Sequence, residues 1–249
     1  MATPRRLSRP PIREALVDLR IDPDATEVSA ATFDTLRQQM ADMYPSTEVR
    51  NAFRTDLLAR VGAAPQTVSE DLGFEAFLLK TADESRIAQF RKNGFTLNQV
   101  GGYTSADDLF DEALRLWGNY VELARPKRVV RIALRYINQL ALPFRHGDEF
   151  TRFLNAPAAL PGDAHVSEFL IRAVTVVNEH DKLSAIVSQR LKTAVGNEGS
   201  PFVLDIDVFR AGEFAVEMGT LRAVFDQIRQ IKNDFFFALL TDEALEPYR

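Results

Sequence analysis

The stretch Val129-Val130-Arg131-Ile132-Ala133-Leu134-Arg135-Tyr136-Ile137-Asn138 decides the fold of this chain. Its side chains alternate in character, and a period of two is typical of a strand with two unlike faces. The alternation continues to Leu142, which predicts a strand over 129–142. One face would carry Arg131, Ala133 and Arg135, and the other Ile132, Leu134, Tyr136 and Asn138. We expect the second face to lie toward helices, where the buried Tyr and Asn would tie down a neighbouring loop.

The elements before this strand and the elements from it onward follow the same order. Residues 1–124 predict strands over 13–21, 49–61, 74–80, 86–91 and 95–100, with helices over 29–43 and from Ser105 to Pro126. Residues 125–249 predict the strand 129–142, a short helix over 148–154, strands over 168–178, 183–192 and 202–210, and a long helix with an apolar stripe from Phe214 to Leu239. Two tandem β-α-β-β-β-α units result, the first with three or four strands after its first helix.

This order predicts an α+β fold in which antiparallel sheets carry helices packed on one face. Residues 1–124 and 125–249 would be two units of one compact structure, an internal duplication in element order without residue-level identity between the halves. The units could form separate sheets or one continuous curved sheet. The second arrangement resembles the TATA-binding-protein-like architecture, a likeness of topology that implies no activity.

The composition excludes several kinds of protein. The 249 residues contain no Cys, which excludes disulfides, thiolate catalysis and Cys-based zinc sites. The net charge of −5 argues against broad electrostatic attraction to nucleic acid. No apolar run approaches the ~20 residues of a membrane helix, and the basic start lacks the apolar stretch of a signal peptide. We expect a cytoplasmic protein without membrane contact.

Two carboxylates share one face of the predicted strand 202–210. Asp205 and Asp207 would project about 7 Å apart, which suits a divalent cation with a third oxygen ligand, or an acid/base pair. A cross-strand ladder of aspartates and arginines explains the same pattern more simply. The arginines that neighbouring strands would contribute are Arg131, Arg135, Arg172 and Arg190.

The histidines and the known catalytic motifs give little evidence for an active site. His180 lies between two acids in a predicted tight turn, and His146 and His165 lie in predicted loops. No nucleophile elbow, phosphate-binding loop, Rossmann or metalloprotease signature occurs. The run 235–237 is three Phe residues, which cannot all face one core because consecutive helical residues diverge by ~100°. We expect packing within the chain, with a homodimer interface as the alternative.

Four short blocks resemble a known family. They are Pro10-Pro11-Ile12 with Glu14-Ala15, Leu116-Trp117 with Tyr120, Arg135-Tyr136 with Asn138, and Phe237 with Leu240-Thr241-Asp242-Glu243. In this order they are similar to a sporadically distributed bacterial and archaeal family of uncharacterised proteins. The resemblance implies special roles for Glu14, Arg135, Tyr136 and Asn138. The patchy distribution of that family implies an accessory role, such as stress response or defence.

These observations favour a non-enzymatic binding or regulatory module without a cofactor. A polar sheet face would hold a protein, peptide or nucleic-acid partner. The alternative is a divalent-metal-dependent hydrolase or phosphoesterase built on the paired aspartates and Glu14. The candidate site residues are Glu14, Arg131, Arg135, Tyr136, Asn138, Asp205 and Asp207.

Overall fold

The computed structural model describes residues 2–3, 5–22, 30–58, 66–142, 150–158, 166–192 and 200–249. Within these ranges nine strands form one antiparallel sheet in the order β2-β3-β4-β5-β1-β6-β9-β8-β7. The strands are β1 (Ile12–Ile21), β2 (Ser46–Leu58), β3 (Gln66–Lys80), β4 (Arg86–Arg91), β5 (Gly94–Val100), β6 (Val129–Leu142), β7 (Phe169–Asn178), β8 (Leu183–Leu191) and β9 (Ser200–Phe214). The α+β class is confirmed, and the sheet is single and continuous.

The two central strands, β1 and β6, join the halves of the chain. They pair antiparallel, with Val17 opposite Leu134 and Ala15 opposite Tyr136. These four side chains are fully buried. The predicted bounds 129–142 of the central strand are confirmed, because its period of two matches the pleat over its whole length.

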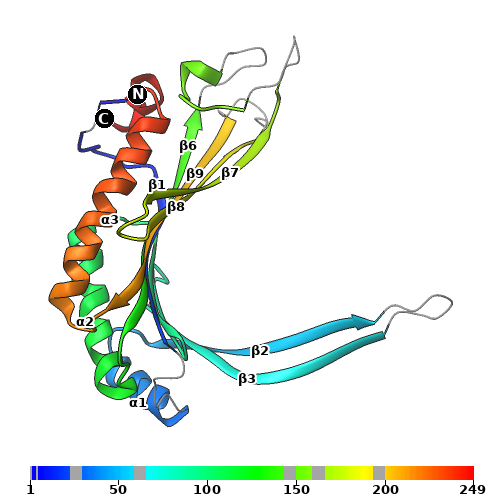
Figure 1. The fold of residues 1–249 in the computed structure, drawn as a ribbon, viewed down its shortest axis with the longest axis vertical. Helices are drawn as coiled ribbons and strands as arrows, with labels where there is room; N and C mark the ends of the chain where they lie inside the picture. Colours follow the sequence, from blue (N-terminus) through cyan, green and yellow to red (C-terminus); the bar gives the residue numbers. More distant parts are fainter. Residues whose placement is uncertain are drawn as a thin grey trace.

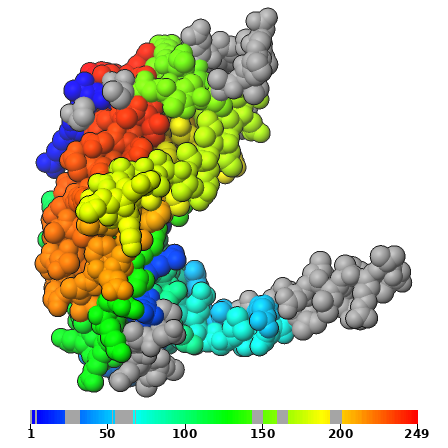
Figure 2. Space-filling view, viewed as in Figure 1, coloured from blue at the N-terminus to red at the C-terminus, as the bar shows by residue number. Residues whose placement is uncertain are grey.

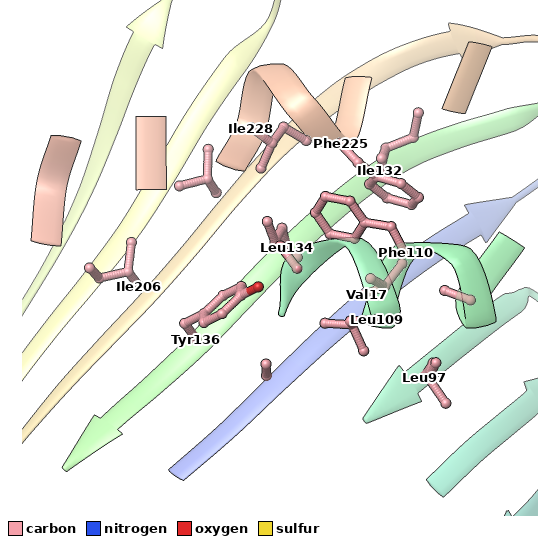
Figure 3. Packing of buried hydrophobic residues seen from close by; sticks show 14 of the residues in the cluster. Val17, Leu97, Leu109, Phe110, Ile132, Leu134, Tyr136, Ile206, Phe225 and Ile228 are labelled. Atoms are coloured by element: carbon pink, nitrogen blue, oxygen red, sulfur yellow. The ribbon is translucent and has the colours of Figure 1, made fainter. Parts of the chain in front are cut away.

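The helices lie on one face of the sheet (Figure 1). They are α1 (Ala30–Met40), α2 (Ala106–Ala124), α3 (Met218–Leu239) and the short α4 (Asp242–Leu245), with 3-10 turns at Phe150–Arg152 and Glu246–Tyr248. Phe110 of α2 stacks on Phe225 of α3, with ring centroids 5.1 Å apart. Both rings cover apolar side chains of the central strands, including Ile132 (Figure 3). The main core therefore lies between the sheet and its helices.

The ends of α2 follow from its flanking residues. Ser105 is the N-cap, and its side chain accepts a hydrogen bond from the backbone N–H of Asp108. Arg125 ends the helix in the left-handed region, with φ at 45°. Pro126 follows, and it cannot continue a helix because it lacks a backbone N–H.

Several expectations need correction. The long helix begins at Met218, because Phe214 still belongs to β9. β3 begins at Gln66, eight residues before the predicted start at 74. The predicted helix 148–154 is a 3-10 turn over Phe150–Arg152 in its described part. Its first two residues lie outside the described ranges, as do His146 and His165.

The phenylalanines at the end of α3 pack within the chain. Phe236 is buried, and Phe235 and Phe237 are partly buried against the same core. They therefore give no structural reason for a second subunit.

The sheet face opposite the helices is concave, and we call it the open face. In Figure 1 the long β2–β3 hairpin projects from one end of the curved sheet, and β7 and β8 form the other end. Figure 2 shows the hollow between these two arms. No described helix covers the open face.

Candidate functional site

Five of the seven predicted site residues lie on the open face. Residues that pair directly across antiparallel strands share a face of the sheet. Arg135 of β6 lies opposite Leu16 of β1 and Asp207 of β9. The site residues that this register places on the open face are Glu14, Arg131, Arg135, Asp205 and Asp207.

Asp18 of β1 is the centre of an ion-pair cluster on this face. Its carboxylate accepts hydrogen bonds from Arg91 Nη2 at 2.5 Å, Arg131 Nη1 at 2.8 Å and Thr96 Oγ1 at 2.8 Å. Arg20 Nε lies 3.3 Å away. Burial alone would raise the pKa of Asp18, but the charge and hydrogen bond of Arg91, together with Thr96 and Arg131, outweigh it and hold the pKa below its usual value. Asp18 therefore stays ionised and fixes its partners.

Arg131 connects this cluster to β9. Its Nη2 lies 3.1 Å from an oxygen of Asp207, and its guanidinium stacks over the Phe209 ring at 4.5 Å. Burial raises the pKa of Asp207 despite the charges of Arg131 and Arg135. The result is a chain of charges from Arg91 through Asp18 and Arg131 to Asp207.

A separate ion pair on the open face joins Arg135 of β6 to Asp205 of β9. Arg135 holds Asp205 in a bidentate contact, with Nε to Oδ1 at 2.8 Å and Nη2 to Oδ2 at 2.6 Å. Its hydrogen bond to Asp205 raises the pKa of Arg135. Glu14 accepts a hydrogen bond from Asn98 Nδ2 at 2.5 Å, and it forms no ion pair with another described residue. The expected ladder of aspartates and arginines is confirmed for these strands.

The ladder does not extend to the far end of the sheet. Arg172 of β7 and Arg190 of β8 lie on the open face, but neither forms an ion pair with a described residue. Beside them on β7, three apolar side chains that share this face are more than half exposed: Leu170 at 69%, Val174 at 62% and Val176 at 60%. The β7–β8 end thus combines unpaired cations with exposed apolar surface.

The paired aspartates do not form a ready cation site. Both carboxylates are already occupied by guanidinium groups, Asp205 by Arg135 and Asp207 by Arg131. A divalent cation needs several oxygen ligands that are free to coordinate it. Among the described residues, no group of three or more His, Asp or Glu side chains is placed to hold a metal ion.

Tyr136 and Asn138 lie on the opposite face, under the helices. Tyr136 is fully buried, and its hydroxyl lies 3.1 Å from that of Tyr103 in the loop before α2. Asn138 donates from Nδ2 to the carbonyl of Leu204 on β9 at 3.0 Å. The expected tie to a neighbouring loop is seen for Tyr136, whereas Asn138 bonds the backbone of the adjacent strand β9. The sheet therefore separates these two residues from the other five.

Sequence reasoning missed two central residues. The period of two places Asp18 on the same strand face as Glu14 and Arg20. Nothing in the sequence, however, marks Asp18 as the acceptor that several arginines share. Lys232 lies on the apolar stripe of α3, eleven residues after Leu221 and four after Ile228, which is helical spacing. The signal in the sequence that could have identified Lys232 is a charged residue at a position that the helical period assigns to the core.

Comparison with models of known protein families gives no match, and comparison with curated proteins gives none either. In the described part of the chain, no helix is long and apolar enough to span a membrane.

Proposed function

We propose that the chain is a non-enzymatic binding module that holds an acidic, partly apolar segment of a partner protein on the open face. The observation that supports this proposal most directly is the β7–β8 end of the sheet. There Arg172 and Arg190 have no acidic partner among the described residues, and Leu170, Val174 and Val176 are exposed beside them.

The chemistry of this end suits a protein partner. Contiguous exposed apolar side chains with a polar surround are typical of interaction sites. Arginine is enriched in such interfaces because its planar guanidinium binds carboxylates in a bidentate way. β7 also ends the strand order of the described sheet, so an extended segment could pair with its backbone.

The ion-pair ladder serves as a rigid base for this surface. Arg131 and Arg135 are held by Asp18, Asp205 and Asp207, so their charges are largely neutralised within the protein. A nucleic-acid partner would need many free Lys and Arg side chains to neutralise its phosphates. The two unpaired arginines of β7 and β8 are better matched to a few carboxylates.

The divalent-metal hydrolase receives no support from the site geometry. A cation between Asp205 and Asp207 would first have to displace Arg135 and Arg131. Loss of those partners would leave partly buried arginines without a counter-charge, which is costly.

The proposal is tested with an array of ten-residue peptides that alternate acidic and β-branched residues, with basic peptides of the same pattern as the comparison. We expect the wild-type protein to select the acidic set. Arg172→Glu with Arg190→Glu should weaken this binding at least about tenfold, since charge-assisted contacts contribute roughly 1.5–3 kcal/mol each.

The matched control is Arg125→Glu with Lys127→Glu, which makes the same change in net charge just beyond the end of α2. Both control positions are exposed. Equal binding of acidic and basic peptides by the wild type, or equal losses in the two double variants, would contradict the proposal.

We also propose that the two halves arose by internal duplication. In each half the first strand (β1 or β6) pairs with the last strand (β5 or β9), and the remaining strands follow outward in reverse order. The two first strands pair with each other at the centre. This arrangement supports a duplication in which the second half has one strand fewer.

A further inference from the structure

A cavity of about 640 Å³ lies on the helix side of the sheet, between the N-terminal segment, the start of α2 and the second half of α3. Its volume is within the usual range for sites that bind small molecules. Its apolar wall consists of Leu7, Pro10, Pro11, Ile12, Ala106, Phe236 and Phe237. Asn138 also lines it, so three of the four sequence blocks quoted above meet here.

Lys232 is the unusual member of the cavity wall. Lys232 exposes only 9% of its surface. Its Nζ lies 3.9 Å from the centroid of the Tyr136 ring, and among the described residues it has no hydrogen-bond acceptor and no carboxylate partner. Burial, with a smaller contribution from the charge of Arg229, lowers the pKa of Lys232 to about 7. The protonated form of Lys232 therefore has no counter-ion among the residues that the structure describes.

Arg5 also lines the cavity, and its charge is paired with Asp242, but two of its N–H donors lack an acceptor. Its Nη1 contacts Asp242 and the carbonyl of Thr3, but Nε and Nη2 are buried without a hydrogen-bond partner in the described chain. Buried polar groups are almost always hydrogen-bonded, so such donors indicate a missing acceptor. Arg6 also lines the cavity and forms no ion pair with a described residue.

The acidic residues of the cavity do not supply this acceptor. Asp107 is held by Arg222 and lies 3.5 Å from Arg229. Asp234 accepts a hydrogen bond from Gln230 Nε2 at 2.9 Å. The cations that line the cavity therefore exceed the acids available to neutralise them.

We propose that this cavity binds a small organic anion. Its carboxylate or phosphate group would be neutralised by Lys232 and Arg6, with Arg5 as a further hydrogen-bond donor, and its apolar body would lie against the wall formed by the proline pair, Ile12 and the two phenylalanines. The site is on the other side of the sheet from the open face and is independent of the proposed protein partner.

Binding of an anion should be coupled to protonation of Lys232. Several charged and titratable groups surround Lys232. They are Tyr136 on β6, Tyr103 in the loop before α2, Asp107 on α2, Arg229 and Asp234 on its own helix, and Arg5 and Arg6 on the N-terminal segment. Burial lowers the pKa of Lys232 to about 7, so this group titrates near neutrality. Between pH 8 and pH 6 its protonated fraction rises from roughly one tenth to nine tenths, so affinity should increase about tenfold as pH falls.

Isothermal titration calorimetry of the full chain tests the proposal with benzoate, phenyl phosphate and inorganic phosphate. Benzyl alcohol serves as the neutral comparison for the same ring. We expect benzoate or phenyl phosphate to bind at least tenfold more tightly than benzyl alcohol and than inorganic phosphate. The stronger of the two anions identifies the head group, and benzoate, which does not titrate near neutrality, reports the pH dependence.

Lys232→Met removes the charge and keeps the length of the side chain, and it should weaken anion binding at least tenfold. Lys127→Met, at an exposed position, is the matched control and should leave binding unchanged. As a second readout, the NMR signal of ¹³C-dimethylated Lys232 should titrate near pH 7 and shift to a higher pKa when benzoate is added. Anions that bind no better than benzyl alcohol, or as well to Lys232→Met as to the wild type, would overturn the proposal.

Discussion

At the scale of single residues, Asp18 is the group on which the ladder depends. It exposes 5% of its surface and is shared by Arg91 of β4, Thr96 of β5 and Arg131 of β6. A buried carboxylate is stable only when its charge is compensated, and here the compensation also fixes two arginines on the open face.

Asp18→Asn should therefore reduce the free energy of unfolding by about 2–4 kcal/mol, because Arg91 and Arg131 would lose a buried counter-charge. Urea denaturation followed by circular dichroism measures the loss. Asp226→Asn removes an exposed carboxylate that lies 3.4 Å from Arg222, and should cost no more than about 0.5 kcal/mol. Similar costs for both variants would contradict this account.

Lys232 gives a pH dependence of stability whose sign can be worked out. Its pKa is lowered from 10.5 to about 7 in the folded protein. Between these two values the unfolded chain holds a proton that the folded chain does not, so the free energy of unfolding rises with pH, by of order 1 kcal/mol per pH unit.

Urea titrations at pH 7 to 9.5 measure this slope below the range in which the buried tyrosines ionise. In Lys232→Met the rise should disappear, since no titrating group remains at that position. An unchanged slope in Lys232→Met would show that another group causes the pH dependence of the free energy of unfolding.

At the scale of the element, the start of α2 depends on one side chain. Ser105 accepts from the N–H of Asp108, and the acids Asp107 and Asp108 lie in the first turn, where they complement the positive end of the helix dipole. Ser105→Ala should lower the free energy of unfolding by about 1 kcal/mol, measured by thermal or urea denaturation. Ser105→Asp, which retains a capping oxygen, should restore most of it. Failure of the Asp variant to recover stability would argue against a capping role.

The strands show which local features could be predicted. The period of two placed Arg131 and Arg135 on one face and Tyr136 and Asn138 on the other, because alternation is a property of the strand itself. The pairing of Arg135 with Asp205 rather than Asp207 depends on side-chain geometry across the strands, which no single strand encodes.

At the scale of the whole molecule, the two halves share one core. Trp117 on α2, the only Trp of the chain, donates from Nε1 to the carbonyl of Val216 in the second half at 2.9 Å. Phe110 and Phe225 stack between the same two helices. A core that crosses the boundary at residue 124 favours cooperative unfolding of both halves together.

Urea unfolding should accordingly show one transition, with the same midpoint by Trp117 fluorescence and by far-ultraviolet circular dichroism. Leu134→Ala, in the central strand pair, should shift both signals together and cost about 2–5 kcal/mol. Two separate midpoints would show that the halves unfold independently.

The global arrangement was only partly predictable. The element order indicated antiparallel strands and helices on one face, but it left open whether there is one sheet or two, since the β1–β6 pairing joins residues more than a hundred positions apart. The cavity is formed by segments from both ends of the chain and from α2, and so could not be inferred from any local pattern.

The two chain ends lie side by side (Figure 1), with the N–H of Ala2 bonded to the carbonyl of Leu240 at 2.8 Å and that of Arg9 to Tyr248 at 3.3 Å. The polypeptide is thus close to a closed circle. A short flexible linker could join residue 249 to residue 1, and new termini could be opened in the exposed turn between Asn178 and Leu183. Such a circular permutant would begin with β8 and β9, yet it would keep every strand neighbour of the original order.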